Sequence, residues 1–255
     1  MDLEEIVEQL KQVSDTPRLD ARLLMAHANG NLEEMIQRRL KHEPVSKIIG
    51  QRGFWKTDFM TSSDVLDPRP DTETMIEAVL QSFPDKQLPY RILDIGTGSG
   101  CILYSLLDEY PKAAGIGIDK SEAALAVAEK NRRERNATLL KRDFNQSDWI
   151  RDLGTFDIIV SNPPYIPTAA IDSLAPDVRD YDPIMALDGG IDGLDAYRAL
   201  AERVPALLKA NGLIFWEIGQ GQAPDVMTIA EERGLKCIRT VTDFGGIERI
   251  LVLQK

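Results

Sequence analysis

The sequence contains the stretch Phe156-Asp-Ile-Ile-Val-Ser-Asn-Pro-Pro-Tyr165, in which an apolar, β-branched run leads directly into two prolines. A short apolar run that ends in this way predicts a buried parallel strand whose carboxyl end opens into a rigid loop. Ligands of open α/β sheets bind at the carboxyl ends of the strands. We therefore expect an α/β fold with a functional loop at residues 161–165.

The loop itself can present hydrogen-bond acceptors in a fixed frame. Asn162 carries a side-chain carbonyl, while Pro163 and Pro164 have fixed φ angles and no N–H group. A planar –NH₂ group of an amide or a nucleobase could donate to the Asn162 oxygen and to a proline carbonyl, with Tyr165 over its π face. The hypothesis is a site that holds such a nitrogen against a strong electrophile. A proline turn without a function is the alternative.

A second stretch, Ile92 to Gly100, runs from a predicted strand into three alternating glycines and then into a helical apolar pattern. Glycines at this place let a ligand approach the backbone at the N-terminus of the helix. Cys101 stands where a dinucleotide fingerprint would have glycine or alanine. This difference favours S-adenosylmethionine over NAD as the ligand.

Further candidates for a nucleoside site follow the glycines. Asp119 ends another predicted strand roughly 20 residues later, where an acidic residue accepts hydrogen bonds from ribose hydroxyls. Phe144 could stack on adenine while Asp143 binds the adenine amino group. A surface carboxylate at position 119 and a core role for Phe144 are the alternatives.

Composition limits the class of protein. Of the 255 residues 43% are hydrophobic and 28% are charged, which is typical of a globular domain. The formal charge of -11 gives no general basic field for nucleic acid, although Arg132, Arg133, Arg135, Lys141 and Arg142 form a local cluster. No signal sequence or membrane span is evident, so we expect a cytoplasmic protein. With two cysteines and two histidines, a disulfide framework, a metal site or a histidine base has little support.

The order of patterns predicts three parts. Residues 1–50 read as a small helical domain, in which Thr16 and Asn31 are candidate N-caps and the last helix ends before Pro44. Residues 51–67 read as a hairpin linker, and residues 68–255 as the catalytic domain. Within it, Asp71 or Thr72 is expected to cap a helix.

The second half of the chain carries the remaining expectations. The polar connection 167–192 is long for a compact domain and is expected to form a lid or a substrate wall. Asn211-Gly212 is expected to stop a helix over 197–208. Residues 236–241 and 249–253 predict two antiparallel strands.

Taken together, the chain resembles the HemK/PrmC family, the protein-glutamine N5-methyltransferases that modify peptide chain release factors. The motifs that carry this resemblance span nearly the whole chain: Thr16 to Ala21, Glu43-Pro44, Pro68 to Glu73, Asp94 to Gly100, Asn162 to Tyr165, Asp182-Pro183, Ala186-Leu187, Glu217 to Gly219 and Gly245 to Arg249. The chain departs from the family at Asp67, where isoleucine is common, and in a helical module shorter by about two helices.

The resemblance implies a class I S-adenosylmethionine-dependent methyltransferase fold, Rossmann-like, with a mostly parallel seven-stranded sheet and a small N-terminal helical domain. It implies methyl transfer from S-adenosylmethionine, which leaves S-adenosylhomocysteine, to the glutamine of a Gly-Gly-Gln motif. The helical domain would dock the release factor. A monomer without stable nucleic-acid or membrane binding is expected, and an adenine-N6 methyltransferase acting on nucleic acid is the alternative.

The resemblance also implies roles for residues. The cofactor would be bound by Gly96, Thr97, Gly98, Ser99, Gly100, Asp119, Asp143, Phe144 and Asn162. The glutamine amide would be bound by Asn162, Pro163, Pro164 and Tyr165. Apart from the resemblance, Arg69 lies between Pro68 and Pro70 and could point into the site toward the substrate, and a surface linker arginine is the alternative. Asn162, Pro163 and Tyr165 would be the catalytic residues.

Overall fold

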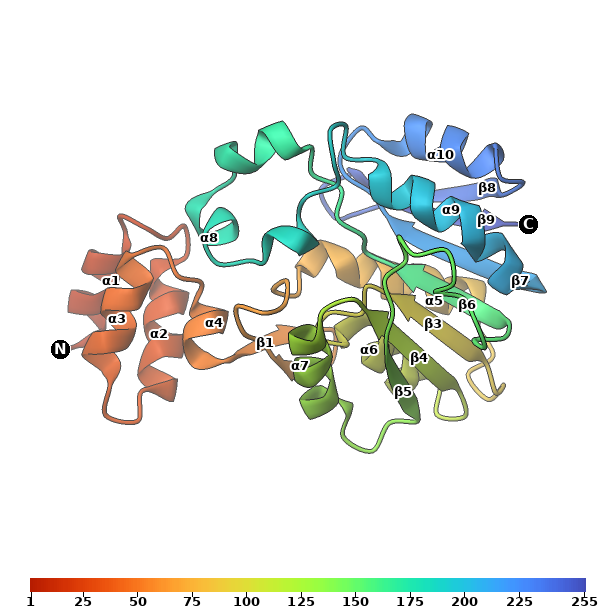
Figure 1. Cartoon of the computed structure of the whole chain (residues 1–255). Helices are drawn as coiled ribbons and strands as arrows, with labels where there is room; N and C mark the ends of the chain where they lie inside the picture. Colours follow the sequence, from red (N-terminus) through yellow and green to blue (C-terminus); the bar gives the residue numbers. More distant parts are fainter.

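A seven-stranded sheet forms the centre of the molecule in the computed structural model, which describes residues 1–255 (Figure 1). The strand order is β5-β4-β3-β6-β7-β9-β8, and β9 alone runs in the direction opposite to the other strands. The strands are β3 (Arg91–Ile95), β4 (Ala114–Asp119), β5 (Ala137–Lys141), β6 (Phe156–Ser161), β7 (Leu208–Glu217), β8 (Lys236–Thr242) and β9 (Glu248–Gln254). The predicted α/β fold and the antiparallel pair at its end are confirmed.

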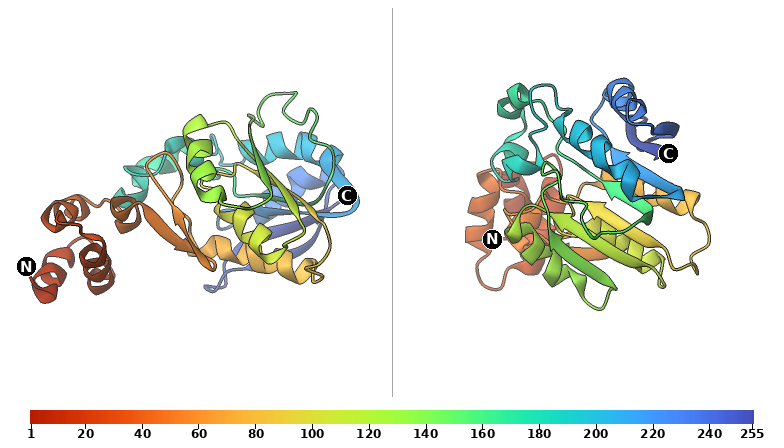
Figure 2. Two further views of the ribbon diagram at one scale, coloured as in Figure 1. Left: turned by 90° about the horizontal axis from the view of Figure 1, so that it is seen from below. Right: turned by 45° about the vertical axis from the view of Figure 1, so that its right-hand side comes forward.

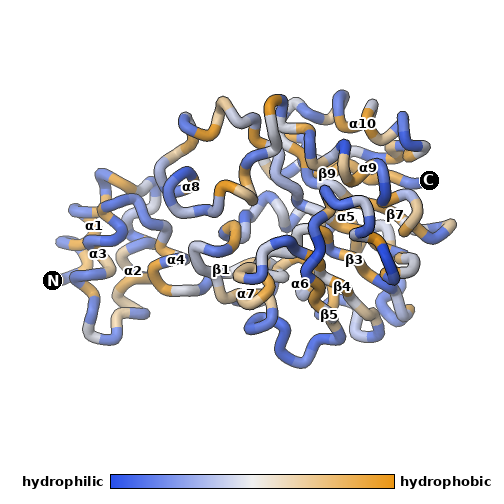
Figure 3. Tube along the Cα trace, in the orientation of Figure 1, coloured by the Kyte–Doolittle hydropathy of each residue, from blue (hydrophilic) through white to orange (hydrophobic).

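Helices cover both faces of this sheet. One face carries α5 (Glu73–Ser82), α6 (Cys101–Glu109) and α7 (Glu122–Arg132), and the other carries α9 (Asp195–Leu207) and α10 (Ala223–Glu231). Because successive side chains of a strand point to opposite faces, Ile92 joins the core under α5 and α6 while Leu93 joins the core under α9 and α10. Figure 3 shows the hydrophobic residues concentrated along the central strands. None of the helices has both the length and the apolar composition that crossing a membrane requires.

The N-terminal helices form a unit of their own at one end of the molecule (Figure 2). They are α1 (Leu3–Leu10), α2 (Pro17–His27), α3 (Leu32–Leu40) and α4 (Val45–Ile49). Their apolar side chains, among them Leu10, Leu24, Ile36 and Ile48, make a separate small core. The helical unit, residues 3–49, is followed by the antiparallel hairpin β1 (Gln51–Phe54) and β2 (Thr57–Met60).

Helix α4 was not expected from the sequence. Pro44 does not mark the end of the helical unit but stands at the N-cap of α4, and Gly50 ends that helix in the left-handed conformation, with φ of 78°. A helix of five residues is too short to show a full apolar period, so the proline was the stronger signal.

The expected N-caps are at the right places but make no capping bonds. Thr16 and Asn31 directly precede α2 and α3, yet neither side chain accepts from the first turn. Their ψ angles of 52° and 25° lie outside the extended region that directs a cap side chain over the helix. Thr72 likewise makes no capping bond, since a 3-10 turn, η1 (Pro70–Thr72), comes before α5.

The expected helix stop at Asn211-Gly212 is wrong. Helix α9 ends at Leu207, and β7 begins at the next residue. The register of β7 against β6 shifts between Leu208 and Leu213, so the Asn-Gly pair lies in a bulge. A Cβ atom at Gly212 would lie 2.9 Å from the carbonyl oxygen of Phe156, and the glycine is therefore required by the approach of two strands.

The connection 167–192 is ordered and contains three short helical segments, η2 (Thr168–Ser173), α8 (Pro176–Arg179) and η3 (Ile184–Ala186). We call it the arm. Its base is closed by backbone bonds, because Ile166 N donates to Leu187 O at 3.0 Å and Gly189 N donates to Ile166 O at 2.9 Å. A Cβ at Gly193 would lie 2.4 Å from the Tyr165 carbonyl oxygen, so the base of the arm runs directly against the Asn162–Tyr165 loop.

Candidate functional site

Two adjoining pockets lie where the predicted loop leaves the sheet. The glycine-turn pocket is lined by residues at or after the ends of β3, β4 and β5, including Gly96 to Ser99, Asp119 and Phe144. The Glu217 pocket is lined by Tyr165, Glu217 and Arg249, together with Asp71, Val178 and Leu187. The two pockets share four wall residues, Leu66, Arg69, Asn162 and Ala186. The strand ends thus bring most of the expected site residues together.

The glycine turn leaves open space in front of its backbone. Gly96 and Gly98 have φ angles of 75° and 54°, and a Cβ at either would meet no atom within 4 Å. These glycines are therefore needed for the positive φ angles, which residues with a side chain rarely adopt. Gly100 differs, because it does not line the pocket and its added Cβ would lie 2.2 Å from the ring of Tyr104. It allows α6 to begin close to the turn.

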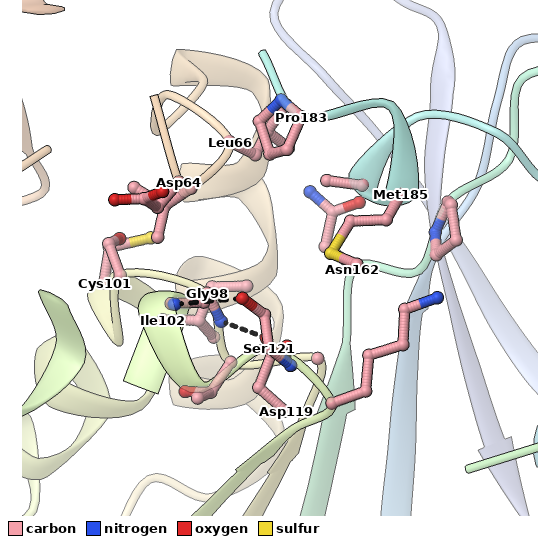
Figure 4. A pocket seen from close by; sticks show the side chains of 18 of the residues that line it. Asp64, Leu66, Gly98, Cys101, Ile102, Asp119, Ser121, Asn162, Pro183 and Met185 are labelled. Atoms are coloured by element: carbon pink, nitrogen blue, oxygen red, sulfur yellow. Dashed lines mark hydrogen bonds between the residues drawn. The ribbon is translucent and has the colours of Figure 1, made fainter. Parts of the chain in front are cut away.

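Asp119 is fixed across this pocket by backbone donors. Gly98 N donates to Oδ2 at 3.0 Å, and Ser121 N donates to Oδ1 at 2.9 Å (Figure 4). Burial raises the pKa of Asp119, while the two backbone bonds act in the opposite direction. Each carboxylate oxygen keeps a further lone pair, so Asp119 can still accept hydrogen bonds from a ligand.

Asp94 lies behind the same turn with an unused acceptor. The Thr97 hydroxyl donates to its Oδ2 at 2.7 Å, but Oδ1 is buried without a partner. Burial raises the pKa of Asp94 to about 7, although the bond from Thr97 lowers it. The turn is therefore backed by a carboxyl group whose charge is poorly compensated.

The structure separates the two residues that were expected to bind adenine. Phe144 lines the glycine-turn pocket while also packing on the core under α9 and α10. Asp143 does not line it, because its Oδ1 accepts from the backbone and side-chain nitrogens of Asn145 at 3.0 and 3.1 Å. This local turn occupies one oxygen of the Asp143 carboxylate. Arg142 and Lys120, which the sequence reasoning missed, contribute to the wall instead.

Asn162 stands at the junction of the two pockets. Its Nδ2 donates to the Thr72 hydroxyl at 3.2 Å, and Oδ1 remains available to a ligand. Pro164 lines the glycine-turn pocket, and Tyr165 lines the Glu217 pocket. Pro163 is buried and lines neither. The predicted loop therefore divides its residues between the two chambers.

Glu217 supplies a buried carboxyl group to the second pocket. It is 2% exposed; Tyr165 OH donates to its Oε1 at 3.4 Å, and Oε2 has no partner. Burial raises the pKa of Glu217 to about 7, while Thr72 and Arg249 act to lower it. Its charge is thus only partly balanced, since Arg249 is also bonded to Asp243 at 2.9 Å.

Several wall segments were not given a site role from the sequence. Glu217 and Arg249 lie in motifs that the chain shares with the family. Glu217 could have been predicted as a site residue, because its carboxylate stands at the end of a buried strand. Residues 64–66 and 183–186 close the glycine-turn pocket from the linker and from the arm (Figure 4). Residues 183–186 lie in the connection 167–192, which was expected to form a lid or a substrate wall, and three of them line the pocket. No local pattern marks residues 64–66, because they reach the pocket only through the tertiary fold.

The chain is similar to several known proteins. A family model described as Methyltransferase small domain matches residues 62–175. The release factor glutamine methyltransferase of Rhodospirillum rubrum is 46% identical, over 94% of this chain and 80% of the relative. The enzyme of the same name from Caulobacter vibrioides is 42% identical, over 93% of this chain and 89% of the relative.

A solved structure supports the fold independently. A methyltransferase from Pyrococcus furiosus aligns with a TM-score of 0.58 over 87% of this chain and 98% of its own. Its sequence identity is 18%, so the likeness concerns the fold alone.

Proposed function

Because the chain belongs to the release factor glutamine methyltransferase family, we propose that it transfers a methyl group from S-adenosylmethionine to a glutamine side chain of peptide chain release factors. The target would be the amide nitrogen in a Gly-Gly-Gln motif. The observation that carries the proposal is the junction of the two pockets at Asn162. A cofactor in one pocket and an amide in the other would meet beside a carboxamide that Thr72 holds in place.

The glycine-turn pocket fits S-adenosylmethionine. Asp119 has acceptor capacity for the two ribose hydroxyls, Phe144 offers a ring face for adenine, and residues 96–99 leave open backbone for the methionine part. Asp94, which accepts from the Thr97 hydroxyl, backs this turn with an unpartnered Oδ1. When bound, the cofactor would supply an activated methyl group for transfer to the amide nitrogen.

The loop and the Glu217 pocket fit an amide side chain. Asn162 Oδ1 and a carbonyl of Pro163 or Pro164 would accept the two hydrogens of the –NH₂ group, and Tyr165 would cover its face. These acceptors hold the nitrogen in line and favour the positive charge that develops on it. Arg69 and Glu217 would line the approach to this position.

Selection of the protein partner would come from surfaces outside the loop, since glutamine side chains are common on proteins. We assign this role to the helical domain, residues 1–50, with residues 51–67 as the linker and residues 68–255 as the catalytic domain. A release factor substrate would place the reaction in the cytoplasm.

A methyl-label transfer experiment tests the proposal. The enzyme is given labelled S-adenosylmethionine with intact release factor, with its Gly-Gly-Gln→Gly-Gly-Ala variant, or with DNA. We expect label on the intact factor only. Label on DNA with none on the factor would favour adenine methylation and overturn the proposal.

A further inference from the structure

Lys47 is a buried cation that joins three separate parts of the chain. It lies on α4 of the helical unit, and its side chain is 3% exposed. Its Nζ lies 2.6 Å from Asp182 Oδ1 and 2.7 Å from Tyr181 O, both in the arm. It also donates to Val65 O at 3.0 Å and to Ser62 O at 3.2 Å, both in the linker after β2.

Asp182 links Lys47 to Arg69, which lines both pockets. Its side chain is 1% exposed, and its second oxygen accepts from Arg69 Nη2 at 2.5 Å. Arg69 lines the glycine-turn pocket and the Glu217 pocket. The backbone N–H of Asp67 also donates to Asp182 at 3.2 Å. Asp182 is therefore held between two cations, one from the helical unit and one from the site.

The segments that Lys47 joins are adjoining parts of the wall of the glycine-turn pocket. Val65 and Leu66 belong to the linker wall, while Pro183 and Met185 follow Asp182 in the arm. Figure 4 shows Leu66 and Pro183 along the same rim. The arm also rests on the helical unit through Tyr181 OH, which donates to Lys41 O at 2.8 Å. The helical unit thus supports the pocket through the linker and the arm.

We propose that Lys47 is a positioning residue for methyl transfer: it fixes Arg69 through Asp182 and holds the linker and the arm together as the walls of the site. The inference rests on the proposed function for its substrate. It gives the helical unit a second role, because a unit that only docked a partner would not affect reaction with a short peptide. Lys47 touches neither pocket and acts only through its neighbours.

The test compares full-length variants in two measurements. Lys47→Met removes the ammonium but keeps most of the stem, and Lys47→Arg keeps a cation that can reach Asp182. Calorimetry gives S-adenosylmethionine affinity, and label transfer to a short Gly-Gly-Gln peptide gives kcat and KM. We expect Lys47→Met to weaken cofactor affinity at least fivefold and to lower kcat on the peptide at least tenfold. Lys47→Arg should stay within threefold of the parent in both.

Arg39→Met is the matched control. Arg39 is another buried cation of the helical unit and is paired with Asp20 at 2.8 Å, but it contacts neither wall. It should lower the melting temperature while leaving peptide kcat within twofold. If Lys47→Met does not fold, Lys47→Gln carries the same expectation, because it keeps a donor and removes the charge.

Unchanged cofactor affinity and peptide kcat in folded Lys47→Met or Lys47→Gln would overturn the inference. Equal losses in Arg39→Met would also overturn it, since they would indicate general destabilisation of the helical unit. If the parent enzyme methylated no release factor, the proposed function would fail, and the calorimetric comparison would still decide the role of Lys47.

Discussion

Asp119 and Glu217 both end strands of one sheet, yet their carboxyl groups are held in opposite ways. Asp119 accepts from two backbone N–H groups of the turns that follow β3 and β4. Glu217 is buried with one oxygen unpartnered, and its neighbours Tyr165, Thr72 and Arg249 come from three other segments. The glycine-turn pocket is thus built from backbone, and the Glu217 pocket from side chains.

This difference indicates how the two halves of the site work. Backbone donors fixed by adjacent turns give a binding surface that needs little rearrangement for a nucleoside. Side chains gathered from distant segments give a chamber whose charges are not fully compensated until a substrate enters. The first half should therefore govern cofactor affinity, and the second half should govern turnover.

The largest effect is expected at the junction of the pockets. Asn162→Ala should lower turnover at least about a hundredfold, because the amide nitrogen would no longer be aligned. Cofactor affinity should stay within threefold. Steady-state kinetics measures turnover and calorimetry measures cofactor affinity on the same preparation. Asn145→Ala, which changes an exposed asparagine, is the control. Near-normal turnover in Asn162→Ala would mean that another residue orients the amide.

Glu217→Gln should change how stability depends on pH. In the parent, burial raises the pKa of Glu217 to about 7, so the unfolded chain loses this proton at lower pH than the native protein does. The protonated Glu217 side chain therefore contributes to the free energy of unfolding at low pH. This contribution falls by on the order of 2–3 kcal/mol as the pH rises from about 5 to 8. Asp94 acts in the same direction.

Urea unfolding of the ligand-free protein at pH 5.5 and 8 checks this. Glu217→Gln should remove roughly half of the fall in stability, since the contribution of Asp94 remains. The same fall in variant and parent would show that the Glu217 pocket carries no electrostatic strain.

Asp119→Ala should weaken cofactor binding by on the order of 1–3 kcal/mol, because charge-assisted hydrogen bonds to the ribose would be lost. Asp143→Ala is the matched comparison, since its carboxylate is turned toward Asn145 and should leave affinity within twofold. Calorimetric titration distinguishes them. Equal losses in both variants would mean that Asp143 swings into the pocket when the cofactor binds.

The smallest effect is expected for Tyr165→Phe. The hydroxyl of Tyr165 is 3.4 Å from Glu217 Oε1, a long contact, so its removal should change turnover by less than threefold. Tyr165→Ala removes the ring as well and should lower turnover further, though less than Asn162→Ala does. A severe defect in Tyr165→Phe would show that the hydroxyl, rather than the ring, orders the Glu217 pocket.

The elements predicted from sequence are those whose signal is local. A strand, a glycine turn and the next helix are adjacent in the chain, so Gly96, Gly98 and the strand ending at Asp119 could be predicted from their order. Adjacency did not give side-chain direction, because Asp143 follows the order expected from the sequence but its Oδ1 accepts from Asn145 rather than lining the pocket. Lys47 and Asp182 are far apart in sequence and meet only in the folded chain.

The closed base of the arm also determines how its length can vary. The bonds between Ile166 and residues 187–189 join the ends of the arm independently of the length of its outer part at η2, which has no buried residues. Lengthening its exposed outer part then adds only loop-closure entropy, about 0.6 kcal/mol for each doubling of length. Insertions there would extend the reach of the molecule toward a partner without displacing the Asn162–Tyr165 loop, so partner choice and chemistry can evolve separately.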